Sequence, residues 1–431
     1  MTTPRHGPLV ATAADLAEGR RKAIEVVEDC LRRLDRDEPS VHAWVRIDRE
    51  SARDIARSLD LQRKPVGPLH GIPIGVKDII DVAGMPTAAG FAPWSDRIAD
   101  RDAPIVARLR AAGAIILGKT VTTPLAWIDP PPTRNPRNLD RTPGGSSSGS
   151  AAAVASAMCL GALGSQTGGS ISRPASYCGV CGLKPSYGVL ETEGIVPLAT
   201  SLDHPGAIAS TVADLSQLWQ ALSGAFSRPR WIDPPRLGRV QGLFDDLCEP
   251  SMREGFARAV KGLEKAGALI DVVAMPPLFD SIGGHFRTIL AFEAARFHRP
   301  WWERYGEAYP KEIRALVEEG LAIGPGRHAE SRRHQDALKA EMASPFDRFH
   351  ALIVPATKGA APDRTTTGDP AFNIPWSYAG LPTVSLPFGL DAEGMPLAFQ
   401  LVGPHGGEDD LLALAEWCER KIAFDPGATP Q

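Results

Sequence analysis

Hydrophobic and polar positions recur along the chain with two different periods, which predict both helices and strands. Apolar residues between positions 16 and 34 recur at helical intervals, and the preceding residues 12–15, Thr-Ala-Ala-Asp, resemble a helix-capping box. A second helix is predicted over residues 49–61. Residues 68–80 mix apolar side chains with glycine and proline, which indicates a short buried strand between turns.

The same alternation continues through the rest of the chain. Pro104 predicts the first turn of a helix and Gly113 its end, and the apolar residues 114–117 predict a strand. The small, apolar residues 151–164 predict a buried helix. Helices and strands that alternate in this way are typical of an α/β fold. Toward the C-terminus, residues 251–345 are predicted to be mainly helical, residues 351–355, 383–387 and 397–402 to be buried strands, and residues 409–424 a closing amphipathic helix.

Composition and charge narrow the class of protein. The chain has 431 residues, of which 43% are hydrophobic and 23% charged, as in globular proteins with a substantial core. A formal net charge of -4 predicts no direct nucleic-acid partner and no membrane surface. Residues 1–10 lack the apolar core of a secretory signal. The six scattered cysteines, including the lone pair Cys178 and Cys181, are interpreted as reduced packing residues, so we expect a cytoplasmic location.

The stretch from Gly113 to Thr120 matches the phosphate-loop pattern GxxxxGK[ST]. That motif requires a strand before its first glycine and an open loop between its glycines. Here a helix is predicted before Gly113, and the Ala-Ile-Ile-Leu between the glycines is predicted to be a strand. We therefore do not predict a phosphate site.

Small residues dominate positions 142–185, where serines follow two glycine turns at Ser146 and Ser170. Glycine allows close approaches that a β-carbon would block. A hydroxyl just after such a turn can lie beside backbone N–H groups, as a serine nucleophile with an oxyanion hole requires. The N–H groups from Thr167 onward surround the second hydroxyl, which makes Ser170 the stronger candidate.

A base for this serine is expected elsewhere, because no histidine lies near either turn. A lysine can take that role if burial makes it neutral. Lys77 stands among apolar neighbours and is the best such lysine, although a surface lysine paired with Asp78 is the alternative interpretation. A different alternative is an α/β-hydrolase elbow, because residues 145–149 match GxSxG around Ser147, but no strand is predicted directly before them.

Together these motifs resemble the amidase signature family of serine hydrolases. The resemblance covers most of residues 12–222 and 351–424, and the stretch between is weakly matched. It is carried by GIPIGVKD at residues 71–78, GKT at 118–120, the stretch from PGGSS to residue 153, GGS at 168–170, PA at 174–175, CGVCGLKP at 178–185, GLPTVSLP at 380–387 and QLVG at 400–403.

The resemblance implies a three-layer α/β/α fold with a large mixed central sheet. We expect one domain over residues 1–431, although residues 227–236 form a break in composition that could be a linker. The pocket is expected to come partly from residues 120–135 and partly from the weakly matched residues 225–345. The implied parts are a signature core at about residues 65–222, a variable, mainly helical stretch at about 225–345, and C-terminal strands and a helix at 350–424.

The family's triad falls on Ser170 as nucleophile, Ser146 as a bridging serine on a cis peptide bond, and Lys77 as base. The implied activity is hydrolysis of a small-molecule carboxylic amide to acid and amine through an acyl-enzyme, as a hydrolase of C–N bonds in linear amides. The resemblance implies no metal and no cofactor. The oxyanion would be held by the N–H groups of Thr167, Gly168 and Gly169.

Three residues depart from the family pattern. Ser148 replaces a glycine, Gln166 replaces the usual acid, and Ser172 replaces the usual arginine, with Arg173 next along. Because the three triad positions are intact, we expect these departures to affect the choice of substrate more than catalysis.

Other functions remain open from the sequence. The glutaminase subunit of a tRNA-dependent amidotransferase shares the signature and would need partner chains, but no charged pair that matches glutamine is evident in residues 280–380. Hydrolysis of a urea-like or ester substrate is a further alternative. A non-catalytic binding protein on the same scaffold is disfavoured by the intact triad. The oligomeric state, a homodimer included, and the need for partner chains are left open.

Overall fold

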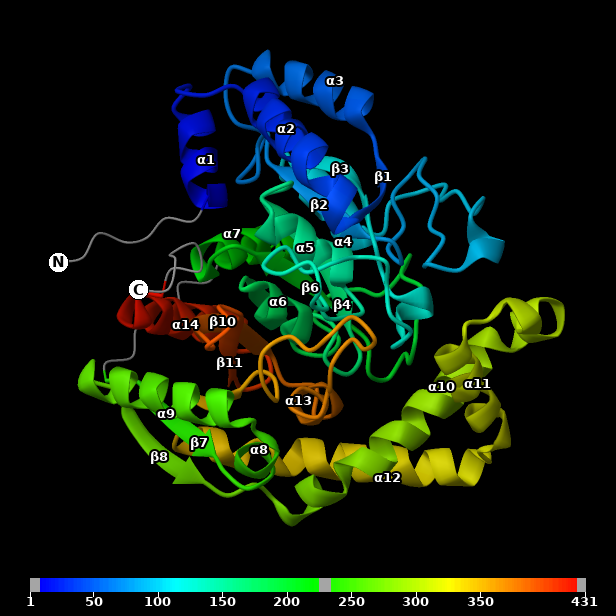
Figure 1. The fold of residues 1–431 in the computed structure, drawn as a ribbon, viewed down its shortest axis with the longest axis vertical. Coiled ribbons are helices and arrows are strands. Elements are labelled where there is room, and N and C mark those ends of the chain that lie inside the picture. The colour runs from blue at the N-terminus through cyan, green and yellow to red at the C-terminus, as the bar shows by residue number, and fades with distance from the viewer. Residues whose placement is uncertain (1–7, 225–233, 425–431) are drawn as a thin grey trace.

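A mixed sheet of 11 strands runs through the computed structural model, which describes residues 8–224 and 234–424 (Figure 1). This confirms the predicted α/β class and the large mixed sheet. In the order β1-β3-β2-β4-β6-β5-β10-β11-β9-β7-β8, the strands are β1 (Trp44–Ile47), β3 (Ile115–Thr120), β2 (Pro73–Lys77), β4 (Gly161–Gln166), β6 (His204–Ala209), β5 (Cys181–Lys184), β10 (Thr383–Leu390), β11 (Pro396–Val402), β9 (Ala351–Pro355), β7 (Arg236–Val240) and β8 (Leu269–Val273).

Helices connect and cover these strands. The α-helices are α1 (Pro8–Ala17), α2 (Ala23–Val41), α3 (Arg49–Asp60), α4 (Pro104–Ala111), α5 (Ser148–Ala155), α6 (Ser172–Cys178), α7 (Val212–Ser223), α8 (Leu243–Leu247), α9 (Pro250–Lys265), α10 (Ile282–Tyr305), α11 (Lys311–Ala322), α12 (Pro325–Glu341), α13 (Ile374–Tyr378) and α14 (Glu408–Ile422). Short 3₁₀ helices are η1 (Ala92–Trp94), η2 (Pro124–Ala126), η3 (Pro277–Ser281), η4 (Gly306–Ala308) and η5 (Ser344–Asp347).

Two groups of helices cover opposite faces of the sheet, and the glycines of β4 show which group covers which face. A β-carbon on Gly161 would lie 2.8 Å from Leu218 of α7, whereas one on Gly164 would lie 2.9 Å from Ser147, just before α5. Positions three apart in a strand point to opposite faces. Helix α7 therefore lies on one face and the pair α5 and α6 on the other, with β4 between them.

Helices α11 and α12 each pack against α10, and the three helices extend away from the sheet, at the lower right of Figure 1. Their sequence is the weakly matched, mainly helical stretch, and β8 is a strand within it that the sequence pattern did not predict. The start of α10 lies close enough to the sheet for Phe286 and Leu290 to line the cavity described below.

The helix expected over residues 16–34 is partly wrong, because two helices share this region. Helix α1 begins at Pro8, so Thr12 is a buried residue within it and not a cap. The chain then turns at Gly19, which has a φ of 71°, and Asp15 accepts a hydrogen bond from Arg20 Nε at 2.8 Å. Helix α2 begins at Ala23, and its apolar positions carry the helical spacing that the pattern showed.

The expected helix over residues 151–164 is also partly wrong. Helix α5 ends at Ala155, and Gly161–Gln166 forms strand β4 between β2 and β6. Small residues fit a tightly packed strand as well as a buried helix, because the sheet neighbours and the helices on both faces leave no room for larger side chains. The pattern of small apolar residues does not distinguish the two.

The remaining sequence predictions have mixed outcomes. The predicted helices at residues 49–61, after Pro104 and at 409–424, and the predicted strands at 68–80, 114–117, 351–355, 383–387 and 397–402, are confirmed within a few residues. The phosphate loop is excluded, because residues 115–120 are strand β3, where Lys119 is buried with its Nζ 3.1 Å from Asp78 Oδ1. Most of the break at residues 227–236 lies outside the described residues, and the single-domain organisation stays a prediction.

Among the described residues, no helix combines the length and the apolar character needed to cross a bilayer.

Candidate active site

Lys77 is the last residue of β2, and its position follows from the sheet topology. Strands β2 and β4 are parallel neighbours, so their carboxyl ends meet at the same edge of the sheet. This places Lys77 beside Ser165 of β4, with Nζ donating to Ser165 Oγ at 2.9 Å. Every residue of β2 is buried, and the Lys77 side chain has no exposed surface.

Ser146 reaches the same edge from the loop that precedes α5. Its carbonyl oxygen accepts a hydrogen bond from Thr123 N at 3.1 Å, and the Gly145–Ser146 peptide bond is cis, as the resemblance implies. Lys77 Nζ donates to Ser146 Oγ at 2.7 Å, in a position buried from solvent. The structure thus brings together two of the three predicted triad residues by direct contact.

Burial sets the electrostatics of this contact. Desolvation lowers the pKa of Lys77 to about 7, and the charge of Asp203 opposes that shift. Burial also raises the pKa of Asp203 to about 7. Its carboxylate accepts a hydrogen bond from Thr167 Oγ1 at 2.5 Å and two more from backbone N–H groups of residues 198 and 199. A neutral amine at Lys77 is therefore accessible near neutral pH.

Ser170 lies in the turn between β4 and α6. The side chain of Gln166 stabilises this turn through hydrogen bonds. Gln166 Oε1 accepts hydrogen bonds from the N–H groups of Ile171 and Ser172, both at 2.9 Å, and its Nε2 donates to Ser377 Oγ at 3.2 Å. A neutral amide here orients the turn where the family usually has an acid.

The three departures from the family pattern do not line the cavity next to Ser170. Gln166 and Ser172 are fully buried, and Ser148 is buried with its Oγ donating to Gly144 O at 2.7 Å. Their effect on substrate choice, which we expected from the sequence, therefore cannot be a direct contact with substrate in this cavity. Arg173, the next residue along, does line it.

A backbone hydrogen bond from Ser147 N to Ser170 O, 3.3 Å long, joins the two serine turns. Within the described part of the chain, no hydrogen bond joins the hydroxyls of Ser146 and Ser170, so the third link of the predicted triad stays a prediction. The hydroxyl of Ser147 is buried and accepts a hydrogen bond from Ser165 N at 3.3 Å. Ser147 is thus a structural residue, and the alternative of a GxSxG elbow has no preceding strand to support it among the described residues.

A cavity of about 510 Å³ opens at Ser170, which is 8% exposed. The three candidate oxyanion residues, Thr167, Gly168 and Gly169, lie on its wall, and the N–H groups of the two glycines donate to no atom of the described residues. Residues from both stretches that were expected to contribute to the pocket, 120–135 and 225–345, line this cavity. Residues 365–374 also line it, which was not predicted. Other lining residues are Ala126, Trp127, Ile128, Pro130, Gly283, Phe286, Arg287, Leu290, Glu312, Thr367, Pro370 and Ile374.

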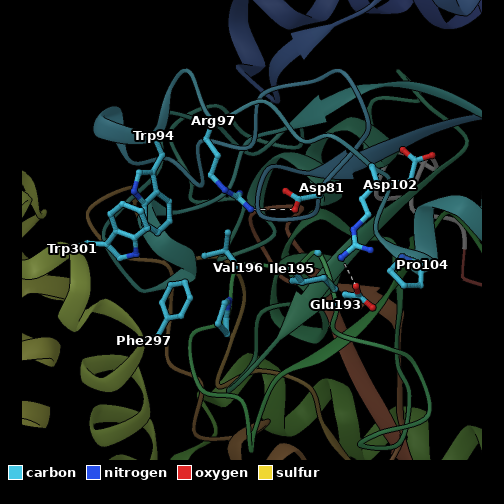
Figure 2. A pocket seen from close by; sticks show the side chains of 13 residues that line it. Asp81, Trp94, Arg97, Asp102, Pro104, Glu193, Ile195, Val196, Phe297 and Trp301 are labelled. Carbon is cyan, nitrogen blue, oxygen red and sulfur yellow. Dashed lines mark hydrogen bonds and ion pairs between the residues drawn. The ribbon is translucent and has the colours of Figure 1, made fainter.

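A second cavity, of about 450 Å³, contains none of the predicted catalytic residues. Figure 2 shows Trp94, Trp301 and Phe297 on one side of it and carboxylates on the other. All three carboxylates are paired with arginines. Asp81 lies 3.1 Å from Arg97, Glu193 lies 2.6 Å from Arg101, and Asp102 lies 3.0 Å from Arg110. The cavity at Ser170 is therefore the candidate active site.

Sequence reasoning missed three residues of this site. Ser165 contacts Lys77, Asp203 acts on its charge, and Arg173 lines the cavity. Arg173 was noticed only as a neighbour of a replaced family residue. No local signal distinguishes these residues, because each acquires its role from strands or loops far away in the chain.

Known proteins are similar in sequence to this chain over most of its length. The family model described as Amidase matches residues 25–412. The A subunit of the glutamyl-tRNA(Gln) amidotransferase from Symbiobacterium thermophilum is 31% identical over 96% of each chain.

Solved structures are similar over nearly the whole chain. A crystal structure of an amidase is 32% identical with a TM-score of 0.90, and the similarity covers 96% of this chain and 99% of the other. The peptide amidase of Stenotrophomonas maltophilia is 26% identical with a TM-score of 0.83, with coverage of 97% and 98%.

Proposed function

The chain belongs to the amidase signature family, and from that premise we propose that it hydrolyses a carboxylic amide to an acid and an amine. In this proposal Ser170 is the nucleophile, Ser146 the bridging hydroxyl and Lys77 the base. The observation that carries the proposal is the buried contact of Lys77 with Ser146, 2.7 Å long, next to a cavity into which Ser170 opens.

The reaction begins with proton transfer away from the nucleophile. Neutral Lys77 takes a proton from Ser146, and Ser146 takes one from Ser170, whose oxygen attacks the amide carbonyl. A base with a pKa near the working pH is effective in this role, and burial lowers the pKa of Lys77 to about 7. The proton then returns through Ser146 to the leaving amine, and water hydrolyses the acyl-enzyme by the same route.

Negative charge that develops on the carbonyl oxygen needs donors that are already in place. The N–H groups of Gly168 and Gly169 have no partner within the described residues, and they lie beside Ser170 on the cavity wall with Thr167. We assign these three residues to the oxyanion hole. Asn373 Oδ1 packs so closely on Gly169 that a β-carbon there would lie 2.5 Å from it, which holds the turn in place.

A second candidate is the glutaminase subunit of a tRNA-dependent amidotransferase. The relative from S. thermophilum, which carries the amidotransferase name, favours it, because the identity of 31% extends over nearly the whole of both chains. The same triad would then release ammonia from glutamine, in a complex with partner chains. A solved amidase at 32% identity supports the first candidate to the same degree.

Turnover by the purified chain distinguishes the two candidates. The chain is tested alone against aliphatic, aromatic and ureido amides, an ester and glutamine, with Ser170→Ala as the control for contaminating activity. Hydrolysis of an amide by the chain alone, lost in Ser170→Ala, supports the first candidate. Glutamine hydrolysis that appears only with partner proteins supports the second, and no turnover under either condition contradicts both.

A further inference from the structure

Arg173 is a buried cation at the wall of the candidate active site. It is 2% exposed, and it lines the same cavity as Ser170 and Gly168. The Nη2 atom donates to Gly145 O at 2.8 Å and to Thr367 Oγ1 at 3.3 Å. The Nε and Nη1 atoms have no hydrogen-bond partner among the described residues. These two atoms carry three of the five N–H donors of a guanidinium.

The charge of Arg173 is not compensated by a carboxylate of the described residues. Arg173 forms no ion pair with any of them, and the acidic residue that acts on it electrostatically is Asp369, which is exposed. Burial lowers the pKa of Arg173 from its usual value, but an arginine keeps its proton at neutral pH. An unpaired buried charge is costly, so a residue of this kind is expected to meet an anion when the site is occupied.

The other charged residues of the cavity are already paired or partly exposed. Arg287 donates through Nε and Nη2 to Glu319 and lies over the ring of Trp127 at 5.4 Å. Glu312 lies 3.2 Å from Lys311 and is 40% exposed. Arg173 is thus the uncompensated cation among the described residues that line the cavity, and the cavity as a whole favours an anionic ligand.

We propose that Arg173 binds a carboxylate of the substrate, so that the chain prefers amides that carry an acid group close to the scissile carbonyl. The inference rests on the proposed function, because it names the substrate class of the same site. Arg173 holds its backbone position through a hydrogen bond from its N to Gly169 O at 2.9 Å. It is therefore placed by the same turn as the nucleophile, only three residues away.

The first test uses the unaltered chain. Its kcat/KM is measured for monoamides of three- to five-carbon dicarboxylic acids and for the matching diamides, in which a neutral carboxamide replaces the carboxylate. A charge-assisted hydrogen bond predicts a preference of about 10- to 100-fold for a monoamide. Equal or faster turnover of the diamides at every chain length overturns the proposal.

The second test compares two arginines of the same cavity. Arg173→Met is expected to raise the KM for the preferred monoamide about 10- to 100-fold with a smaller change in kcat, and Arg173→Lys to restore part of the loss. Arg287→Met removes the same charge from the same cavity, but from a paired guanidinium, and is expected to keep the preference. An equal loss of preference in both variants, or an equal loss for monoamide and diamide in Arg173→Met, overturns the proposal.

A third measurement separates this inference from the proposed function. Succinate is added to the wild-type chain and to Arg173→Lys, and the melting temperature of each is followed. Succinate is expected to raise the melting temperature of the wild type and to inhibit the wild type competitively, and both effects should be weaker in the variant. If succinate has no effect on the wild type, this result contradicts the anion site, whether or not the chain is active. If the chain hydrolyses neutral amides and a fluorophosphonate probe labels Ser170, the proposed function stands even if the carboxylate preference fails.

Discussion

Lys77 Nζ lies 2.7 Å from Ser146 Oγ, and both side chains are buried. The two residues are 69 positions apart, and each is placed by a separate part of the fold. Lys77 ends a buried strand. Ser146 follows a cis peptide bond in a loop, and its carbonyl oxygen accepts a hydrogen bond from Thr123 N. Through this contact Lys77, whose pKa is lowered, can act on the candidate active site by way of the Ser146 hydroxyl.

Replacement of Lys77 by methionine tests its role as base. Lys77→Met keeps an apolar side chain of similar length but removes the amine, so kcat/KM for amides should fall about 10²- to 10⁴-fold with little change in the circular dichroism spectrum. Lys184→Met is the matched control. Lys184 is also fully buried with a pKa lowered to about 7, but it lies in β5 and donates to Pro185 O at 3.3 Å. Unchanged turnover in Lys77→Met, or an equal loss in both variants, removes Lys77 as the base.

A fluorophosphonate probe tests which serine attacks. The wild type should be labelled at Ser170, as located by mass spectrometry of the digested protein, because this hydroxyl opens into the cavity. Ser170→Ala should lose the label. Ser147→Ala should keep it, since the Ser147 hydroxyl is buried against Ser165. Label that persists in Ser170→Ala, or that maps to Ser147, contradicts the assignment.

The dependence of activity on pH reports the charge of Lys77. Because the base must be neutral, kcat/KM should rise with pH and level off above about 7. The charge of Asp203 raises the pKa of Lys77, so Asp203→Asn should lower that pKa and move the rising limb to lower pH. Asparagine keeps the oxygen that accepts the backbone hydrogen bonds. A limb that stays in place or moves to higher pH is inconsistent with this coupling.

Gly168 and Gly169, which directly precede Ser170, provide a matched pair of variants that tests the role of this turn. A β-carbon on Gly169 would lie 2.5 Å from Asn373 Oδ1, whereas one on Gly168 would lie no closer than 3.5 Å to any neighbour. Gly169→Ala should therefore displace the turn and lower kcat about 10²-fold, the scale of a misplacement of about 1 Å. Gly168→Ala should act mainly on KM, because its methyl group would narrow the cavity. Steady-state kinetics of both variants check the difference, and equal kcat values contradict it.

The buried pair of Lys119 and Asp78 tests the interpretation of the GKT motif as structural. Both side chains are buried and their charged atoms lie 3.1 Å apart. Lys119→Met leaves Asp78 unpaired and should lower the free energy of unfolding by about 3–5 kcal/mol, as measured by urea denaturation. The exposed pair of Arg101 and Glu193 is the control, and Arg101→Met should change stability little. A Lys119→Met variant as stable as the control would refute the interpretation.

Several features were predictable from the sequence because their signals are local. The helix that begins at Pro104 ends at Ala111, two residues before Gly113, which has a φ of 91°. The helix predicted over residues 49–61 is α3, which ends at Asp60. The alternation of helices and strands predicted the α/β class, and the motifs around Lys77, Ser146 and Ser170 indicated the family. Local signals failed where small residues fit two structures, as in residues 151–164, since only the neighbouring strands show that β4 is a strand.

The sequence by itself determined the class of fold, the family and the candidate triad, because periodicity and motif spacing are properties of neighbouring residues. The tertiary structure alone decided the chemistry of the site. The lowered pKa of Lys77 requires burial by β3 and β4, and the cavity requires the loop at residues 365–374, which lies 194 positions from Arg173 at the Thr367 contact. Desolvation and unpaired charge arise when distant segments pack together. The apolar neighbours of Lys77 indicated its burial, but no sequence pattern marks the unpaired charge of Arg173.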